Sequence, residues 1–104
     1  MLEITKDNFE QEVVKSDVPV LLDFWAPWCG HCVHLMPTVE EIANEANGKF
    51  KVAKVNIDEE PDLAMQFGVM SIPTCAKVEG GEVKAKTLGN LPKEALLAQL
   101  GLEL

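Results

Sequence analysis

Two cysteines separated by two residues form the segment with the clearest chemical potential, Cys29-Gly30-His31-Cys32. The segment follows an apolar stretch typical of a buried strand and opens a pattern typical of a helix. Residues three positions apart lie on one face of a helical turn, so the two sulfurs can reach each other. The spacing therefore predicts a redox-active pair that exchanges with disulfides of other molecules.

The two cysteines are expected to play different parts. The unpaired amides and the dipole of a helix start stabilise negative charge and lower the pKa of a thiol located there, so Cys29 is predicted to be the attacking sulfur. Cys32 lies one turn deeper on the apolar stripe and is predicted to resolve the mixed disulfide. A zinc site is the alternative, but no second Cys-x-x-Cys or distant ligand pair completes four ligands, so no metal is expected.

Asp23 is the third residue with chemical potential, because it interrupts the otherwise apolar run from Val18 to Ala26. Burial without a partner disfavours the carboxylate, raises its pKa and keeps the group protonated near neutral pH. Such a carboxyl group can exchange protons with a neighbour.

The elements that must position these residues alternate between strands and helices. Strands are predicted at 2–4, 18–26, 50–57, 74–78 and 83–88, and helices at 7–14, from Cys29 to Gly48, at 61–67 and at 91–100. Asp7 and Glu10 are expected to cap the first helix, Pro37 to bend the second, and Gly80-Gly81 to form a hairpin turn. The order predicts an α/β fold, a mixed sheet covered on both faces.

Length and composition limit the other possibilities. With 104 residues, of which 47% are hydrophobic, we expect a single domain over 1–104. A net charge of −8 disfavours nucleic acid and anionic membrane surfaces as partners, and no apolar run approaches the ~20 residues that span a bilayer. The opening residues lack the pattern of a secretory signal and the cysteine count is odd, so a cytoplasmic monomer is expected.

The segment Asp23-Phe24-Trp25-Ala26-Pro27-Trp28-Cys29-Gly30-His31-Cys32 resembles the active-site segment of thioredoxins, and Ile72-Pro73-Thr74 resembles their substrate-side loop. The resemblance extends over the whole chain. It implies the thioredoxin fold, with a central mixed β-sheet flanked by α-helices on both faces. It also implies reduction of protein disulfides without a bound cofactor, and re-reduction by a thioredoxin reductase that draws electrons from NADPH or another donor.

The same resemblance implies roles for Asp23 and Lys54. Asp23 matches the acid that serves Cys32 as proton acceptor and donor, and Lys54 matches a lysine that modulates this acid. An Asp23–Lys54 pair that only neutralises itself is the alternative interpretation.

A substrate surface around the cysteines is also implied by the resemblance. Pro73 matches a proline with a cis peptide bond beside the active site, although trans is the commoner state of such bonds. Gly30, Ile72 and Gly89 match positions that contact substrate, although Gly89 is equally consistent with a simple turn. Trp28 is expected to form part of the rim and Trp25 part of the core.

His31 is the most informative departure, because thioredoxins usually carry proline there and protein disulfide isomerase domains carry histidine. A partly protonated imidazole beside Cys29 stabilises its thiolate and predicts a less reducing potential. A disulfide isomerase or oxidase therefore stays open as an alternative. A redox-inert module that uses the same surface to dock a partner protein is a further alternative, independent of His31. Cys75 is expected to act mainly as a small core residue, with a regulatory thiol as the alternative, and Lys77 either marks a less covered sheet or extends outward.

Overall fold

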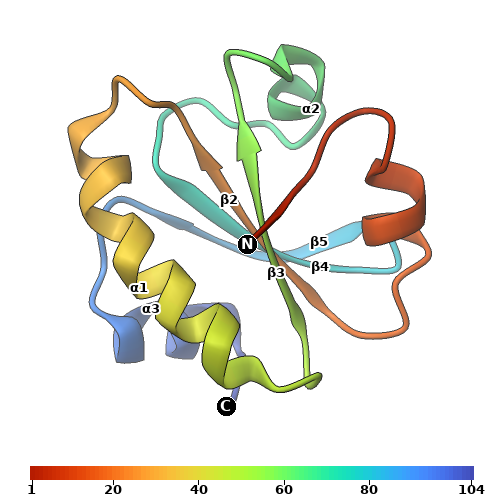
Figure 1. Cartoon of the computed structure of the whole chain (residues 1–104), viewed down its shortest axis with the longest axis vertical. Helices are drawn as coiled ribbons and strands as arrows, with labels where there is room; N and C mark the ends of the chain where they lie inside the picture. Colours follow the sequence, from red (N-terminus) through yellow and green to blue (C-terminus); the bar gives the residue numbers. More distant parts are fainter.

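A five-stranded mixed sheet lies at the centre of the computed structural model, which describes residues 1–104 (Figure 1). The strand order is β1-β3-β2-β4-β5. The strands are β1 (Leu2–Glu3), β2 (Val20–Trp25), β3 (Lys51–Asn56), β4 (Thr74–Glu79) and β5 (Glu82–Leu88). The first three run parallel, whereas β4 is antiparallel to β2 and β5 is antiparallel to β4. The predicted mixed α/β sheet is confirmed.

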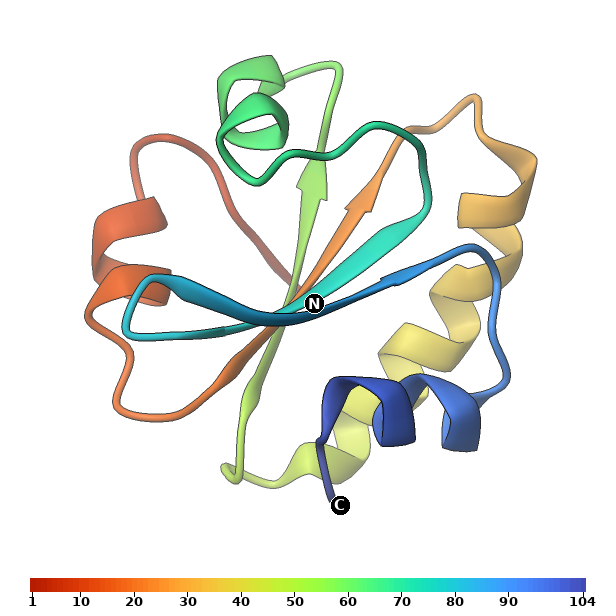
Figure 2. The same ribbon diagram turned by 180° about the vertical axis from the view of Figure 1, so that it is seen from behind.

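Helices cover both faces of this sheet (Figures 1 and 2). They are the π-helix η1 (Glu10–Val14), α1 (Gly30–Ala46), α2 (Pro61–Gln66) and α3 (Lys93–Leu100). Leu21 packs with residues of α1 and α3 in one apolar core, while Leu22 and Phe24 pack with residues of η1 and α2 in a second core. None of the helices combines the length and the apolar character needed to cross a membrane.

Strand β2 lies between β3 and β4 and is buried on both faces, as its continuous apolar sequence predicts. Side chains alternate along a strand, so Asp23 and Trp25 share the face of Leu21, which α1 and α3 cover. Asp23 is completely buried there. The sheet therefore holds a carboxyl group beneath the helix that carries the cysteines.

Helix α1 follows the predicted periodicity. Its buried residues are Cys32, Leu35, Val39, Ile42 and Ala46. The helix ends where Asn47 and Gly48 adopt left-handed backbone conformations, at φ 48° and 82°. It continues past Pro37, so the proline does not end it, and the expected bend stays a prediction.

The predicted capping of the N-terminal helix by Asp7 and Glu10 is wrong, and the helix is shorter than expected. The π-helix begins at Glu10 without a side-chain cap. Two other polar residues organise the preceding turn: the Thr5 N–H donates to Asn8 Oδ1 at 2.8 Å, and the Asp7 N–H donates to Thr5 Oγ1 at 3.2 Å. These local bonds satisfy the backbone that a helix from residue 7 would have used.

Strands β4 and β5 form the expected hairpin through Gly80 and Gly81, which both have positive φ. The pairing of the two strands has an irregularity at Lys77/Val78, and Val83 is exposed. The question about Lys77 is answered by its contacts: its ammonium group donates to the Gly101 carbonyl at 3.1 Å and pairs with Glu79. The lysine therefore extends outward to the end of α3.

Candidate active site

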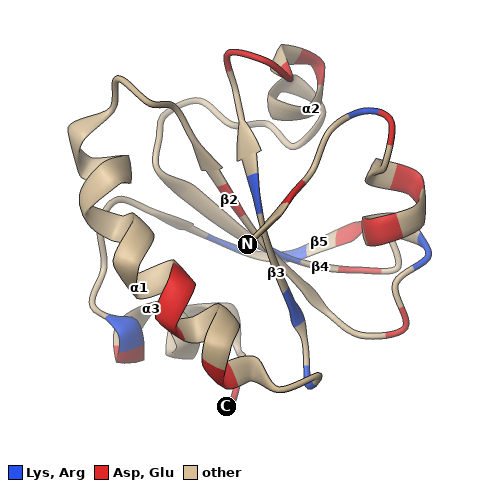
Figure 3. Ribbon diagram, in the orientation of Figure 1, with Lys and Arg blue, Asp and Glu red and all other residues tan.

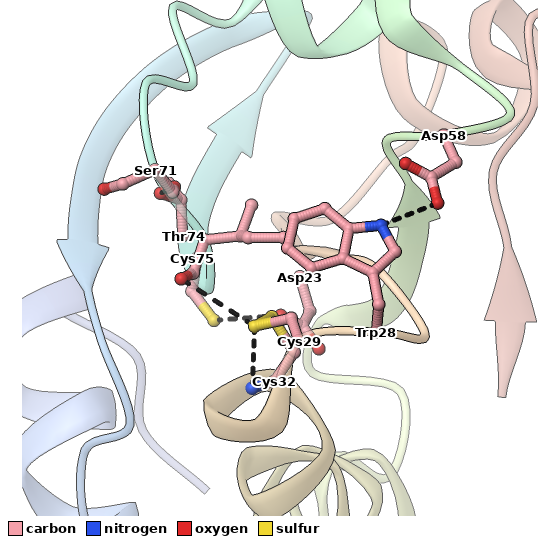
Figure 4. The surroundings of a disulfide bond; sticks show 9 residues. Asp23, Trp28, Cys29, Cys32, Asp58, Ser71, Thr74 and Cys75 are labelled. Atoms are coloured by element: carbon pink, nitrogen blue, oxygen red, sulfur yellow. Dashed lines mark hydrogen bonds between the residues drawn. A yellow bond between two sulfur atoms is a disulfide. The ribbon is translucent and has the colours of Figure 1, made fainter.

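Cys29 and Cys32 form a disulfide at the start of α1, with their Cα atoms 5.2 Å apart (Figure 4). Cys29 is the N-cap residue of the helix, with extended backbone, and its Sγ accepts a hydrogen bond from the Cys32 N–H at 3.2 Å. Cys29 is 8% exposed and Cys32 is fully buried. Cys29 is therefore the more accessible of the two cysteines.

The electrostatic surroundings favour a negative charge on Cys29. The first turn of α1 contains no acidic residue, and the amides at this end of the helix point toward the N-cap. Once the disulfide is reduced, a thiolate at this position meets hydrogen-bond donors and no opposing carboxylate. This arrangement suits a nucleophilic sulfur.

The loop before β4 lies against the outer cysteine. The Ile72–Pro73 peptide bond is cis, as the resemblance implied, and the Ile72 carbonyl oxygen is 3.9 Å from Cys29 Sγ. The backbone N–H and C=O of Ile72 bond to no other backbone group, whereas the Gly89 N–H donates to the Pro73 carbonyl at 2.9 Å. Ile72, Pro73 and Gly89 thus lie together, and the N–H and C=O of Ile72 are not paired with other backbone groups.

The two tryptophans have different environments, as predicted. Trp28 is 68% exposed, and its indole N–H donates to Asp58 Oδ2 at 2.9 Å. Trp25 is partly buried and packs against the cluster that contains both active-site cysteines. Trp28 is therefore held at the rim by a residue that the sequence analysis did not single out.

Asp23 has the perturbed acidity that its sequence setting predicts. Burial raises the pKa of Asp23 to about 7, opposed by a hydrogen bond from Cys75 and the positive charge of Lys54. The Cys75 thiol donates to Asp23 Oδ1 at 3.8 Å, and Oδ2 has no hydrogen-bond partner (Figure 4). Lys54 and Asp23 form no ion pair, since the Lys54 nitrogen lies over the Trp25 ring, 5.1 Å from its centroid. A self-neutralising pair is therefore not present.

Gly30 and His31 occupy the exposed outer side of the first turn of α1. Space around Gly30 is open, with no atom near the position of an added Cβ. The side chains of His31 and His34 are exposed and form no ion pair. His31 differs from His34 in lying between the two cysteines.

Apart from Asp58 at the rim, the segments around the disulfide lack formal charge, in contrast to the acidic chain as a whole. No Lys, Arg, Asp or Glu occurs in 24–39, 64–76 or 87–92, and Figure 3 shows the first turns of α1 and the preceding loop free of charged residues. Met65 and Met70 are 79% and 95% exposed near this region and line one apolar groove. The surface around the disulfide is therefore largely uncharged and partly apolar.

The hydrogen bond between Cys75 and Asp23 was not anticipated from the sequence. It depends on the register of β2 against β4, which places these residues opposite each other. No sequence signal fixes that register, although the position of Cys75 just after the substrate-side loop placed it near the site. Nothing in the sequence pointed to Asp58 as the partner of Trp28.

Comparison with known proteins agrees with this geometry. A family model described as Thioredoxin matches residues 1–101. The chain is 51% identical over 94 residues to Thioredoxin 1 of Nostoc sp., covering 90% of this chain and 88% of the relative. It is 48% identical over 96 residues to the thioredoxin of Haemophilus influenzae, covering 92% and 90%, and 44% identical over 98 residues to that of Chlorobaculum thiosulfatiphilum, covering 94% and 91%.

Proposed function

Because the chain belongs to the thioredoxin family and is a thiol–disulfide oxidoreductase acting through Cys29 and Cys32, we propose a division of labour among its site residues. Cys29 attacks, Cys32 resolves, and Asp23 handles the proton of Cys32. The observation that carries this assignment is the difference in exposure between the two cysteines at the start of α1. Cys29 reaches the surface, whereas Cys32 is buried on the side that faces the sheet.

The first step forms a mixed disulfide. The Cys29 thiolate attacks one sulfur of the substrate disulfide, so a bond from Cys29 to that sulfur forms and the substrate's own bond breaks. The departing substrate sulfur leaves as a thiolate and takes a proton from solvent. The Cys32 N–H, which already bonds to Cys29 Sγ at 3.2 Å, favours the thiolate that begins the step.

The second step releases the substrate. Asp23 as a carboxylate accepts the proton of the Cys32 thiol, and the Cys32 thiolate attacks Cys29 Sγ and breaks the mixed disulfide. The second substrate sulfur leaves and is protonated, so two electrons have passed from the dithiol to the substrate. With a pKa of about 7, Asp23 can both accept and return a proton near neutral pH.

The packing of α1 on β2 supports the proposed proximity of Asp23 to Cys32. Cys32 belongs to the sheet-facing stripe of the helix, and its cluster packs against Trp25, which shares the strand face of Asp23. Lys54 is proposed to act on this acid through its charge, because that charge lowers the pKa of Asp23 without an ion pair.

Substrate is proposed to bind across this largely uncharged surface. An extended segment of the partner protein would pair with the free N–H and C=O of Ile72, alongside Pro73 and Gly89. Gly30 allows close approach because no side chain projects there, and Trp28 supplies an exposed aromatic contact. The same surface would receive the reductase that regenerates the dithiol.

His31 is proposed to make the protein a weaker reductant than thioredoxins with proline at that position. Its imidazole lies in the exposed first turn that Cys29 caps, where positive charge favours the thiolate of the reduced form. We also propose that the chain works as a cytoplasmic monomer of one domain, in keeping with its single sheet and its odd number of cysteines.

Trapping tests the assignment of the two sulfurs. A Cys32→Ser variant incubated with a protein disulfide such as oxidised insulin should accumulate a mixed disulfide at Cys29, because the second step has no thiol. The matched Cys29→Ser variant should accumulate none under the same conditions. Mapping of the trapped bond to Cys75, or equal trapping by the two variants, would reject the assignment.

A further inference from the structure

Four polar or titratable residues form one row across the sheet. Asp23 lies opposite Lys54 on β3 and opposite Cys75 on β4, and Cys75 lies opposite Thr87 on β5. Residues paired in register project to the same face of a sheet, and Cys75 belongs to the apolar core that α1 and α3 cover. The row therefore runs beneath the helix that carries the active-site disulfide.

Most of this row is buried. Asp23, Cys75 and Thr87 are 0%, 1% and 4% exposed. Asp23 Oδ2 and the Thr87 hydroxyl have no hydrogen-bond partner. The bond from the Cys75 thiol to Asp23 Oδ1, at 3.8 Å, is therefore the only hydrogen bond that Asp23 accepts through its side chain.

Cys75 is the donor in this bond. Burial, followed by the nearby Asp23, raises the pKa of Cys75 well above its usual value, so the thiol keeps its proton over the working range of Asp23. A donor to a carboxylate favours the ionised form and opposes the effect of burial. Cys75 thus stabilises the form of Asp23 that accepts a proton.

Few other groups lie close enough to affect the ionisation of Asp23. The charged or titratable groups next to Asp23 on the sheet are Lys54 from β3 and Cys75 from β4. Helix α1 contributes Cys32 after reduction, as proposed above, whereas α3 contributes the apolar Leu96 and Leu100. The Lys54 nitrogen is placed over Trp25 and acts only through its charge. Cys75 is the one group that donates a hydrogen bond to the Asp23 side chain.

We propose that Cys75 is a positioning residue for the second step, whose thiol orients the Asp23 carboxyl and sets the pH range in which Asp23 accepts the proton of Cys32. The proposal rests on the proposed role of Asp23. It gives the third cysteine a part in disulfide exchange in which its own sulfur is never oxidised.

Titration of the Asp23 carboxyl carbon by NMR tests the hydrogen bond itself. The oxidised protein is used, so that Cys32 does not titrate, and the wild type is compared with Cys75→Ala and Cys75→Ser. Loss of the donor in Cys75→Ala should lower the ionisation constant of Asp23 about three- to tenfold. Cys75→Ser keeps a hydrogen-bond donor of similar size, so the ionisation constant of Asp23 in this variant should equal or exceed that of the wild type. An unchanged constant in Cys75→Ala, or equal decreases in both variants, would overturn the proposal.

The pH profile of the second step tests the catalytic consequence. The release of a mixed disulfide preformed at Cys29 is timed against pH, and its midpoint should move upward in Cys75→Ala by the shift seen in the titration. In an Asp23→Asn background, the Cys75→Ala change should leave the profile where it is. If Cys75→Ala shifts the titration of Asp23 but leaves the pH profile of release unchanged, Asp23 is not the proton acceptor and the proposal is overturned. If Cys75→Ala leaves the titration of Asp23 unchanged, the effect of Cys75 on Asp23 is overturned, but the proposed role of Asp23 is not.

Discussion

The backbone N–H of Cys32 donates a hydrogen bond to Cys29 Sγ at 3.2 Å, so the resolving residue also stabilises charge on the attacking one. This bond exists because Cys29 is the N-cap of α1 and Cys32 is the third residue of that helix. A side chain at the N-cap accepts from this amide in many helices, and here the acceptor is the reactive sulfur. One turn of helix thus provides both the spacing and the electrostatics of the exchange reaction.

Stability should depend on pH through Asp23. Its pKa is raised from 3.8 to about 7 in the folded state, so the unfolded chain loses the proton first as pH rises. Below about pH 4 the raised pKa therefore does not lower the free energy of unfolding. The destabilisation grows with pH between the two pKa values and reaches its maximum above the upper one. A shift of this size corresponds to roughly 4 kcal/mol at most.

Replacement of Asp23 by asparagine removes this penalty. In urea unfolding of the oxidised protein, Asp23→Asn should exceed the wild type in free energy of unfolding by a few kcal/mol at pH 8, and the difference should shrink toward zero at pH 4. A difference that is the same at both pH values would show that Asp23 carries no raised pKa. The same variant should slow disulfide reduction near neutral pH.

The redox potential should respond to His31. We expect the wild type to have a higher, less reducing potential than His31→Pro, because the imidazole stabilises the thiolate of the reduced form; about 30 mV corresponds to ~1.4 kcal/mol. Equilibration with glutathione or dithiothreitol measures both potentials. His34→Leu, which changes an exposed histidine of the same helix outside the Cys29–Cys32 segment, is the control and should leave the potential unchanged. Equal potentials for wild type and His31→Pro would remove the tuning role.

Trp28 should matter for protein substrates more than for small ones. Its exposed indole, held by Asp58, is lost in Trp28→Ala, and KM for a protein disulfide should rise about 5- to 30-fold, as for a contact worth 1–2 kcal/mol. The rate with a small aromatic disulfide should change little. Val83→Ala, which trims an exposed apolar residue on β5, serves as control. Equal losses with both substrates would assign Trp28 to the structure of the site instead of to docking.

The central elements could be predicted because their sequence patterns are strong. Strand β2 is apolar on both faces, and α1 repeats apolar residues at three and four positions from Cys32 to Ala46. The burial of Asp23 could be predicted for the same reason, since a carboxyl group within such a strand has to be buried. The cysteine spacing then placed the chemistry at the junction of these two elements.

The errors and omissions arise where several local or long-range partners compete. Asp7 and Glu10 fit a capping pattern, but Thr5 and Asn8 form the bonds that organise the turn. The register between two strands cannot be predicted from any short segment of sequence. The contact between Cys75 and Asp23 depends on that register and was therefore not predicted.

The acidity of the Cys29 thiol tests the central claim most directly. In a reduced Cys32→Ser variant, absorbance of the thiolate or the rate of alkylation, followed against pH and mapped to residue 29, measures its pKa. We predict a value clearly below the ~8.5 of a free cysteine, because the sulfur caps α1 and accepts the amide at position 32. A value at or above that of a free cysteine would contradict the account, since Cys29 would then have no advantage as the attacking sulfur.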